Sequence, residues 1–171
     1  MATARYYKTG VFDSATWTPA GANGTVTTSV PILYGATGSV STCCISRISG
    51  SVMGGGTYPA SATVTVSINS VSGTAAGGAT ATVTHLDAGT VPAATTFLTA
   101  GGASPTAITG LTVGASYWSE VIPFTAGSAW GEWESPSFEV TIPASSKFAV
   151  VVTASSAGTT TAFGGEISFS E

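Results

Sequence analysis

The chain has 171 residues, of which four are Lys or Arg, eight are Asp or Glu and one is His, so charged residues make up 7% of it and its net charge is −4. Because an ordinary soluble domain carries about 25% charged residues, few side chains are available for acid–base, nucleophilic or metal chemistry, and we predict a protein that is not an enzyme and holds no cofactor. The sequence has no basic cluster, which argues against nucleic acid as a partner, since that binding depends on neutralising phosphates.

Ten segments are predicted to be strands, with the clearest alternation of apolar residues with polar ones at a period of two in residues 25–34, 61–71 and 138–142. In chain order they are residues 5–12, 25–34, 41–52, 61–71, 79–86, 107–113, 116–124, 138–142, 148–152 and 163–169. Glycine-containing turns separate several of them, at residues 20–24, 54–56, 73–78, 101–102 and 155–158. No segment shows a helical period, so the pattern predicts an all-β chain, an antiparallel β-sandwich or jelly-roll-like fold in a single domain of residues 1–171.

Two of these segments show most clearly which side chains face the core and which face solvent. In residues 61–71 the predicted core face consists of Ala62, Val64, Val66 and Ile68. The predicted solvent face consists of Thr63, Thr65, Ser67 and Asn69. Residues 148–152 are apolar on both faces and are predicted to form a central strand. Pro31 and Pro123 each remove a backbone donor, which places them at a sheet edge or a bulge.

The length and hydrophobicity of the chain indicate a folded protein without a membrane-spanning helix. A chain of this length buries about 70% of its unfolded surface, so the 43% of hydrophobic residues can form one core. The longest apolar run, residues 148–152, is far shorter than the roughly 18 residues of a membrane helix. The first ten residues lack the apolar stretch of a secretory signal. We therefore expect a protein that folds in a cytoplasm, has no membrane partner and, with so few charges, has much of its surface covered by other subunits.

Cysteine and histidine residues offer little chemistry. Cys43 and Cys44 are adjacent, so on a strand they point to opposite faces and are expected to be two separate reduced thiols. With one histidine, a zinc site cannot be drawn from one chain. If its strand is regular, His85 shares a face with Ala79, Ala81 and Val83, and it is expected to be a packed or interface residue.

Aromatic residues provide the candidate contact sites. Trp118, Trp130 and Trp133 lie within sixteen residues of one another, and such side chains serve as core, as protein-interface anchors or as platforms for sugars. Glu132 and Glu134 flank Trp133, and they either line a glycosidase-like cleft or keep an aromatic loop hydrated. All of these alternatives stay open at this stage.

The amino-terminal part supplies a second candidate contact. Residues 1–24 form either an arm or the first strand. Arg5, Tyr6, Tyr7 and Lys8 combine half of the positive charge of the chain with two aromatic rings. They are predicted either to bind a protein lattice or to belong to an ordinary first strand.

The closing segment, KFAVVVTASSAGTTTAFGGEISFSE at residues 147–171, resembles the last hairpin of small structural proteins of tailed bacteriophages, in particular capsid decoration (cement) proteins. The similarity consists of an apolar strand, a Ser/Thr/Gly turn and a Gly-Gly-Glu-Ile strand, and the Ala, Gly, Thr and Ser content of the whole chain supports it. It implies an all-β module, often a trimer, that reinforces the joints between major capsid proteins without catalysing a reaction.

Three functions follow as hypotheses. The first is a structural virion protein, assembled in the host cytoplasm, that binds the capsid lattice as a homo-oligomer, with a trimer favoured. The alternative is a glycan- or receptor-binding module of a phage fibre that uses the three tryptophans. The third is a self-assembling surface or filament subunit. A β-sandwich can serve any of them.

Overall fold

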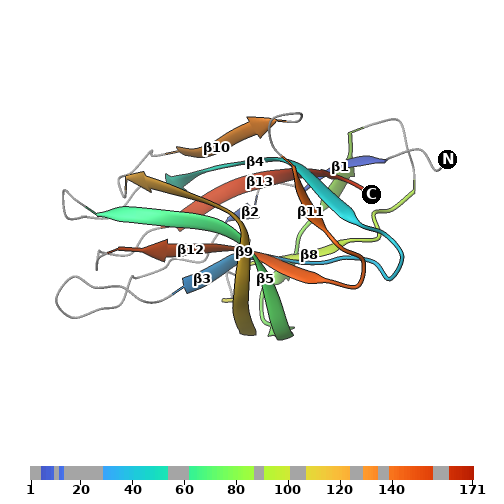
Figure 1. Cartoon of the computed structure of the whole chain (residues 1–171), viewed down its shortest axis with the longest axis horizontal. Helices are drawn as coiled ribbons and strands as arrows, with labels where there is room; N and C mark the ends of the chain where they lie inside the picture. The colour runs from blue at the N-terminus through green and yellow to red at the C-terminus, as the bar shows by residue number, and fades with distance from the viewer. Residues whose placement is uncertain are drawn as a thin grey trace.

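A computed structural model describes residues 5–9, 12–13, 29–53, 62–86, 91–100, 107–123, 129–134, 139–155 and 162–171. These residues contain thirteen strands and no helix. All strand pairs are antiparallel, and the strands form two sheets that pack against each other (Figure 1). The predicted antiparallel β-sandwich is therefore confirmed, while the jelly-roll-like connection of the strands stays a prediction.

The two sheets have different strand orders. Sheet 1 runs β10 (Ala129–Glu134), β4 (Cys43–Met53), β13 (Ala162–Ser170), β1 (Tyr6–Thr9) and β7 (Val83–His85), and in addition β11 (Val140–Ile142) pairs with β4 and β2 (Phe12–Asp13) pairs with β13. Sheet 2 runs β6 (Ala79–Thr80), β8 (Thr96–Thr99), β3 (Ser29–Ala36), β12 (Lys147–Ala154), β5 (Thr63–Ala76) and β9 (Thr109–Pro123). The longest strand, β9, therefore lies at one end of sheet 2.

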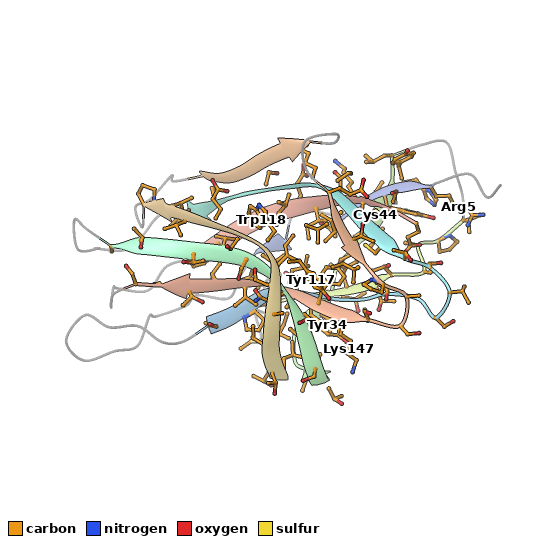
Figure 2. All side chains as sticks on the ribbon, viewed as in Figure 1. Arg5, Tyr34, Cys44, Tyr117, Trp118 and Lys147 are labelled. Atoms are coloured by element: carbon orange, nitrogen blue, oxygen red, sulfur yellow. The ribbon has the colours of Figure 1, made fainter. Side chains whose placement is uncertain are left out.

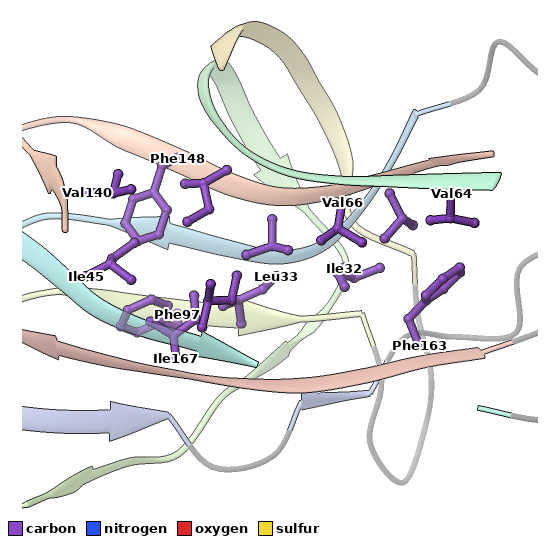
Figure 3. Packing of buried hydrophobic residues seen from close by; sticks show 14 of the residues in the cluster. Ile32, Leu33, Ile45, Val64, Val66, Phe97, Val140, Phe148, Phe163 and Ile167 are labelled. Carbon is purple, nitrogen blue, oxygen red and sulfur yellow. The ribbon is translucent and has the colours of Figure 1, made fainter. Parts of the chain in front are cut away.

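The main core lies between the sheets, and Figure 3 shows part of it. Its members include the predicted core face: Ala62, which precedes β5, and Val64, Val66 and Ile68 on β5. Aromatic rings extend through this core from β1 to β12: Tyr7 stacks on Phe169 with centroids 5.3 Å apart, Phe169 lies 5.2 Å from Phe97, and Phe97 meets Phe148 edge-on at 5.8 Å. The burial of these apolar side chains is the main favourable contribution to folding.

A second, smaller core covers the outer face of sheet 2. It consists of Tyr34, Val71, Ala100, Ile108, Ala149 and Val151. This cluster explains why β12 is apolar on both faces, and it confirms that β12 is a central strand, between β3 and β5. The prediction that Ser67 and Asn69 face solvent was wrong: they are 9% and 8% exposed, because this face of sheet 2 is itself covered.

Several segments differ from the predicted strands. The predicted strand at residues 79–86 is split, since β6 pairs with β8 in sheet 2 whereas β7 pairs with β1 in sheet 1. The segments predicted at residues 107–113 and 116–124 are one strand, β9. Gly114 and Ala115 between them form part of an irregularity whose carbonyl oxygens accept hydrogen bonds from Asn69 Nδ2 and Ser70 Oγ, both at 3.2 Å. Strands β8 and β10 were not predicted.

The two prolines lie at positions where the lack of a backbone N–H donor disturbs the hydrogen bonding of the sheet least. The register of β12 on β3 shifts between the pairs that contain Leu33 and Pro31, which places Pro31 at an irregularity. Pro123 is the last residue of β9, the end strand of sheet 2. Both positions agree with the prediction of an edge or a bulge.

The first and last described strands of sheet 1 lie side by side. Residues 6–8 of β1 pair with residues 168–170 of β13. Buried Thr9 strengthens this contact, because its Oγ1 accepts a hydrogen bond from the backbone N–H of Ile167, 158 residues away in the chain, at 3.1 Å. The Glu171 carboxylate accepts hydrogen bonds from the backbone N–H groups of Ala94 and Thr95 at 2.7 and 2.6 Å, and so fastens the segment that leads into β8.

Candidate interaction surface

Among the described residues, the edge of β9 that faces away from β5 is the most prominent surface feature, since no described strand pairs with it. β9 has 15 residues and ends sheet 2, where its sheet neighbour is β5. Val113, Tyr117 and Val121 are 37%, 42% and 62% exposed, and they are three of the seven large hydrophobic side chains that are exposed in the described part of the chain. A free edge also presents backbone N–H and C=O groups that can pair with another strand. We call this surface the β9 edge.

The first third of this edge, residues 109–113, belongs to a ribbon that extends past the rest of sheet 2. β12 pairs with β5 from Val64 to Ser70, whereas the pairing of β5 with β9 continues as far as Ala76 and Thr109. Residues 71–76 and 109–113 therefore form a two-stranded ribbon, whose end projects from the sandwich in Figure 1. No charged residue occurs in either segment.

Specific contacts hold the ribbon in place. Gly73 and Gly110 have φ angles of 96° and 76°, which favour glycine. A Cβ on Gly73 would collide with the carbonyl oxygen of Gly110, and a Cβ on Gly110 would collide with that of Thr74. Lys147 Nζ donates a hydrogen bond to the Gly73 carbonyl at 2.6 Å, and Figure 2 shows Lys147 beside the ribbon.

Of the three tryptophans singled out in the sequence, the structure describes the side chain of Trp118. Trp118 pairs with Ile68, a residue of the inner face, and packs partly buried against the main core; its neighbour Tyr117 is the more exposed aromatic residue (Figure 2). Trp130 and Trp133 lie on β10, opposite Gly50 and Ile48 of β4. The prediction of an aromatic loop there was wrong, because residues 129–134 form a strand; the side chains of Trp130, Glu132, Trp133 and Glu134 lie outside the described part.

The amino-terminal candidates divide between core and surface. β1 lies inside sheet 1, between β13 and β7. Tyr7 is 1% exposed, and its hydroxyl donates a hydrogen bond to the carbonyl of Val91 at 3.1 Å, so its side chain is not available to a partner. Arg5 and Tyr6 are exposed and Lys8 is half-buried. Residues 6–9 thus form an ordinary strand inside sheet 1, and of the four candidate residues Tyr7 is removed from the surface. Residues 14–24 lie outside the described part.

His85 lies at a pocket between the ends of the two sheets. The expectation that it shares a strand face with Ala79 was wrong, since the chain crosses from sheet 2 to sheet 1 between them. The His85 ring lies 4.7 Å from the Tyr7 ring, and both line a pocket of about 380 Å³ whose other walls include Ala81, Val83 and Phe97.

Charged and metal-binding groups are sparse on the described surface. Arg47 Nη1 lies 3.2 Å from Glu166 Oε1 across β4 and β13. Among the residues with described positions, no three His, Cys, Asp or Glu side chains gather as a metal-binding group. The same residues include no helix that could cross a membrane.

The adjacent cysteines are free thiols in different environments. Cys43 is fully buried and Cys44 is half-buried. Burial raises the pKa of the Cys43 thiol from its ordinary value of 9.0 to about 12. Since the thiolate is the reactive form, Cys43 is inert in the folded protein.

We expect iodoacetamide at pH 8 to modify Cys44 well before Cys43. Mass spectrometry of the single variants Cys43→Ala and Cys44→Ser separates the two rates, and urea is expected to remove the protection of Cys43. In the unfolded chain the Cys43 thiol has its ordinary pKa of 9.0, whereas in the folded protein its pKa is about 12. Between pH 9 and 12 the unfolded state loses this proton and the folded state keeps it, so the free energy of unfolding falls as the pH rises. Rapid modification of Cys43 in native protein contradicts its placement in the core.

Comparison with known proteins finds no family model, no curated protein and no solved structure that matches the chain. The fold itself defines the class: an all-β sandwich protein with an exposed, charge-poor edge strand.

Proposed function

We propose that this chain is a non-enzymatic structural protein of a tailed-phage virion that binds the capsid lattice as a decoration protein. The observation that carries the proposal is the β9 edge, an exposed strand of 15 residues on a protein with very few charges. The resemblance of residues 147–171 to phage structural proteins supports the virion as the place where this association occurs.

The edge favours a role in association for a physical reason. Proteins that work alone protect long edge strands with lysine, with proline, with β-bulges or with a covering segment, because bare edges pair with other chains. The pairing of β9 with β5 has register shifts, but other protections are scarce. β9 contains no Lys or Arg, and its one proline is its last residue. Along this strand, Val113, Tyr117 and Val121 add exposed apolar area. Covering this edge with another protein removes the apolar area from water and satisfies backbone groups.

The proposed partners are the major capsid protein or other virion proteins, together with further copies of this chain, for which the phage resemblance implies a trimer. A stable contact of this kind buries about 800 Å² on each partner. The proposed location is the virion, after assembly in the host cytoplasm.

The test is the composition of purified particles. Quantitative mass spectrometry of virions from the source of the sequence is expected to find this chain in a fixed ratio to the major capsid protein, at capsid-scale copy number. A parallel glycan-array measurement on the isolated protein addresses the fibre-module alternative. Absence from particles together with specific glycan binding that Trp133→Ala abolishes would replace the proposal with that alternative.

A further inference from the structure

We propose that the β9 edge is the contact between two copies of this chain, which pair β9 with β9 in antiparallel fashion and continue sheet 2 across a twofold axis. This inference rests on the proposed function and names a second copy of the chain as the partner of the β9 edge, in a dimer that takes the place of the trimer implied by the phage resemblance. A twofold contact uses the same patch on both copies, so the patch must match itself in length, charge and shape.

Strand length favours a second copy of β9. The strands at the other sheet ends are β6, β7 and β10, with two, three and six residues. Among the described strands, β9 with 15 residues finds an edge of equal length in another β9. A trimeric ring made by pairing strand edges head to tail would need a second long edge on each copy, and the described sheet ends do not provide one.

Charge is compatible with this symmetry. Antiparallel pairing about a twofold axis brings residues near the axis close to their own copies, so a charged residue there would face a like charge. Residues 109–119 contain no charged side chain. The next residue, Glu120, is charged, but it pairs with Val66 of the main core. Its side chain therefore lies on the inner face of β9, which faces sheet 1.

Shape and hydrophobicity also favour the pairing. Gly114 and Ala115 at the middle of β9 are exposed and small, so another backbone can approach closely. Val113 and Tyr117 flank this small pair with exposed apolar side chains. Contacts between these side chains and their copies would add to the backbone pairing.

The experiment is analytical ultracentrifugation of the isolated full chain over a range of concentrations. We expect a monomer–dimer equilibrium for the unchanged protein. Val113→Lys and Val121→Lys, which place a charge on the edge, are expected to raise the dimer dissociation constant at least about tenfold. The matched control is Val40→Lys, because Val40 is 91% exposed and lies outside every strand, and it is expected to leave the constant unchanged. Circular dichroism verifies that each variant folds.

Amide hydrogen exchange provides a second measurement that does not depend on variants. Exchange within residues 112–117 is expected to slow as the protein concentration rises, while exchange at residues 39–42 stays constant. A monomer at all concentrations, a trimer, or a dimer that Val40→Lys weakens as much as Val121→Lys overturns the pairing. If the protein is a monomer but abundant in particles, the pairing is refuted and the proposed function stands. If it is an edge-paired dimer but absent from particles, the pairing stands and the proposed function is refuted.

Discussion

Val150→Asp is expected to destabilise the protein by more than about 4 kcal/mol, which is enough to unfold many single domains. Val150 is fully buried in the main core, on β12 between β3 and β5. The new carboxylate would lie among apolar side chains and have no partner, and burying an unpaired charge is among the most costly changes in a protein core.

The matched control for this change is Thr65→Asp. Thr65 lies on the neighbouring strand β5, opposite Thr153 of β12, and is half-buried on the outer face of sheet 2. Its carboxylate can reach water, so we expect a loss of about 1 kcal/mol or less. Urea unfolding followed by circular dichroism gives both values. If Val150→Asp does not fold, Val150→Ala compared with Val121→Ala measures the same contrast, and equal losses at buried and exposed positions would show that the strand facing is wrong.

Phe169→Ala is expected to cost about 3–5 kcal/mol, the range for truncation of a large buried aromatic side chain. Phe169 is fully buried and contacts the rings of Tyr7 and Phe97, with centroids 5.3 and 5.2 Å away. Its loss opens a cavity at the point where β13, β1 and β8 meet, and interrupts the series of rings that joins the two sheets.

Tyr6→Ala is the control for this second prediction. Tyr6 is an aromatic residue on β1 next to Tyr7, but it is 50% exposed, so its removal is expected to cost about 1 kcal/mol or less. Thermal and urea unfolding of both variants provide the comparison. If Tyr6→Ala lowers the free energy of unfolding as much as Phe169→Ala does, the faces of β1 are wrongly assigned. Tyr7 would then no longer be identified as a core residue.

Local alternation predicted most of the described strands, but not β8 or β10, and many of the strand faces. The core face of β5 and the central position of β12 followed from the apolar residues within 62–68 and 148–152, because these side chains are buried as their types predict. Alternation could not predict that residues 79–86 serve two sheets, since each half shows the same period and the choice of sheet depends on distant partners. The burial of Asn69 was missed for the same reason: the second core that covers it comes from segments far away in the sequence.

The candidate contact residues were predicted less well than the strands. Alternation alone indicated that Tyr6 and Tyr7 face opposite sides of β1, yet both were grouped as one surface. Trp118 was selected for its size, but its place opposite Ile68 directs it to the core, and the smaller Tyr117 is exposed at a register shift that the sequence does not reveal. Glycine and two glutamates made residues 129–134 look like a loop, and only their pairing with β4 identifies them as a strand.

The pairing of β1 with β13 has a consequence for how the chain acquires its structure. Contacts such as that between Thr9 and Ile167, 158 residues apart, close a very long loop, and proteins rich in such contacts fold on the slow timescale of milliseconds to seconds. During synthesis, the centre of sheet 1 stays incomplete until residues 162–170 have emerged from the ribosome. Until then β4 and β1 lack the strand that separates them, and nascent chains expose sheet edges that the finished fold conceals.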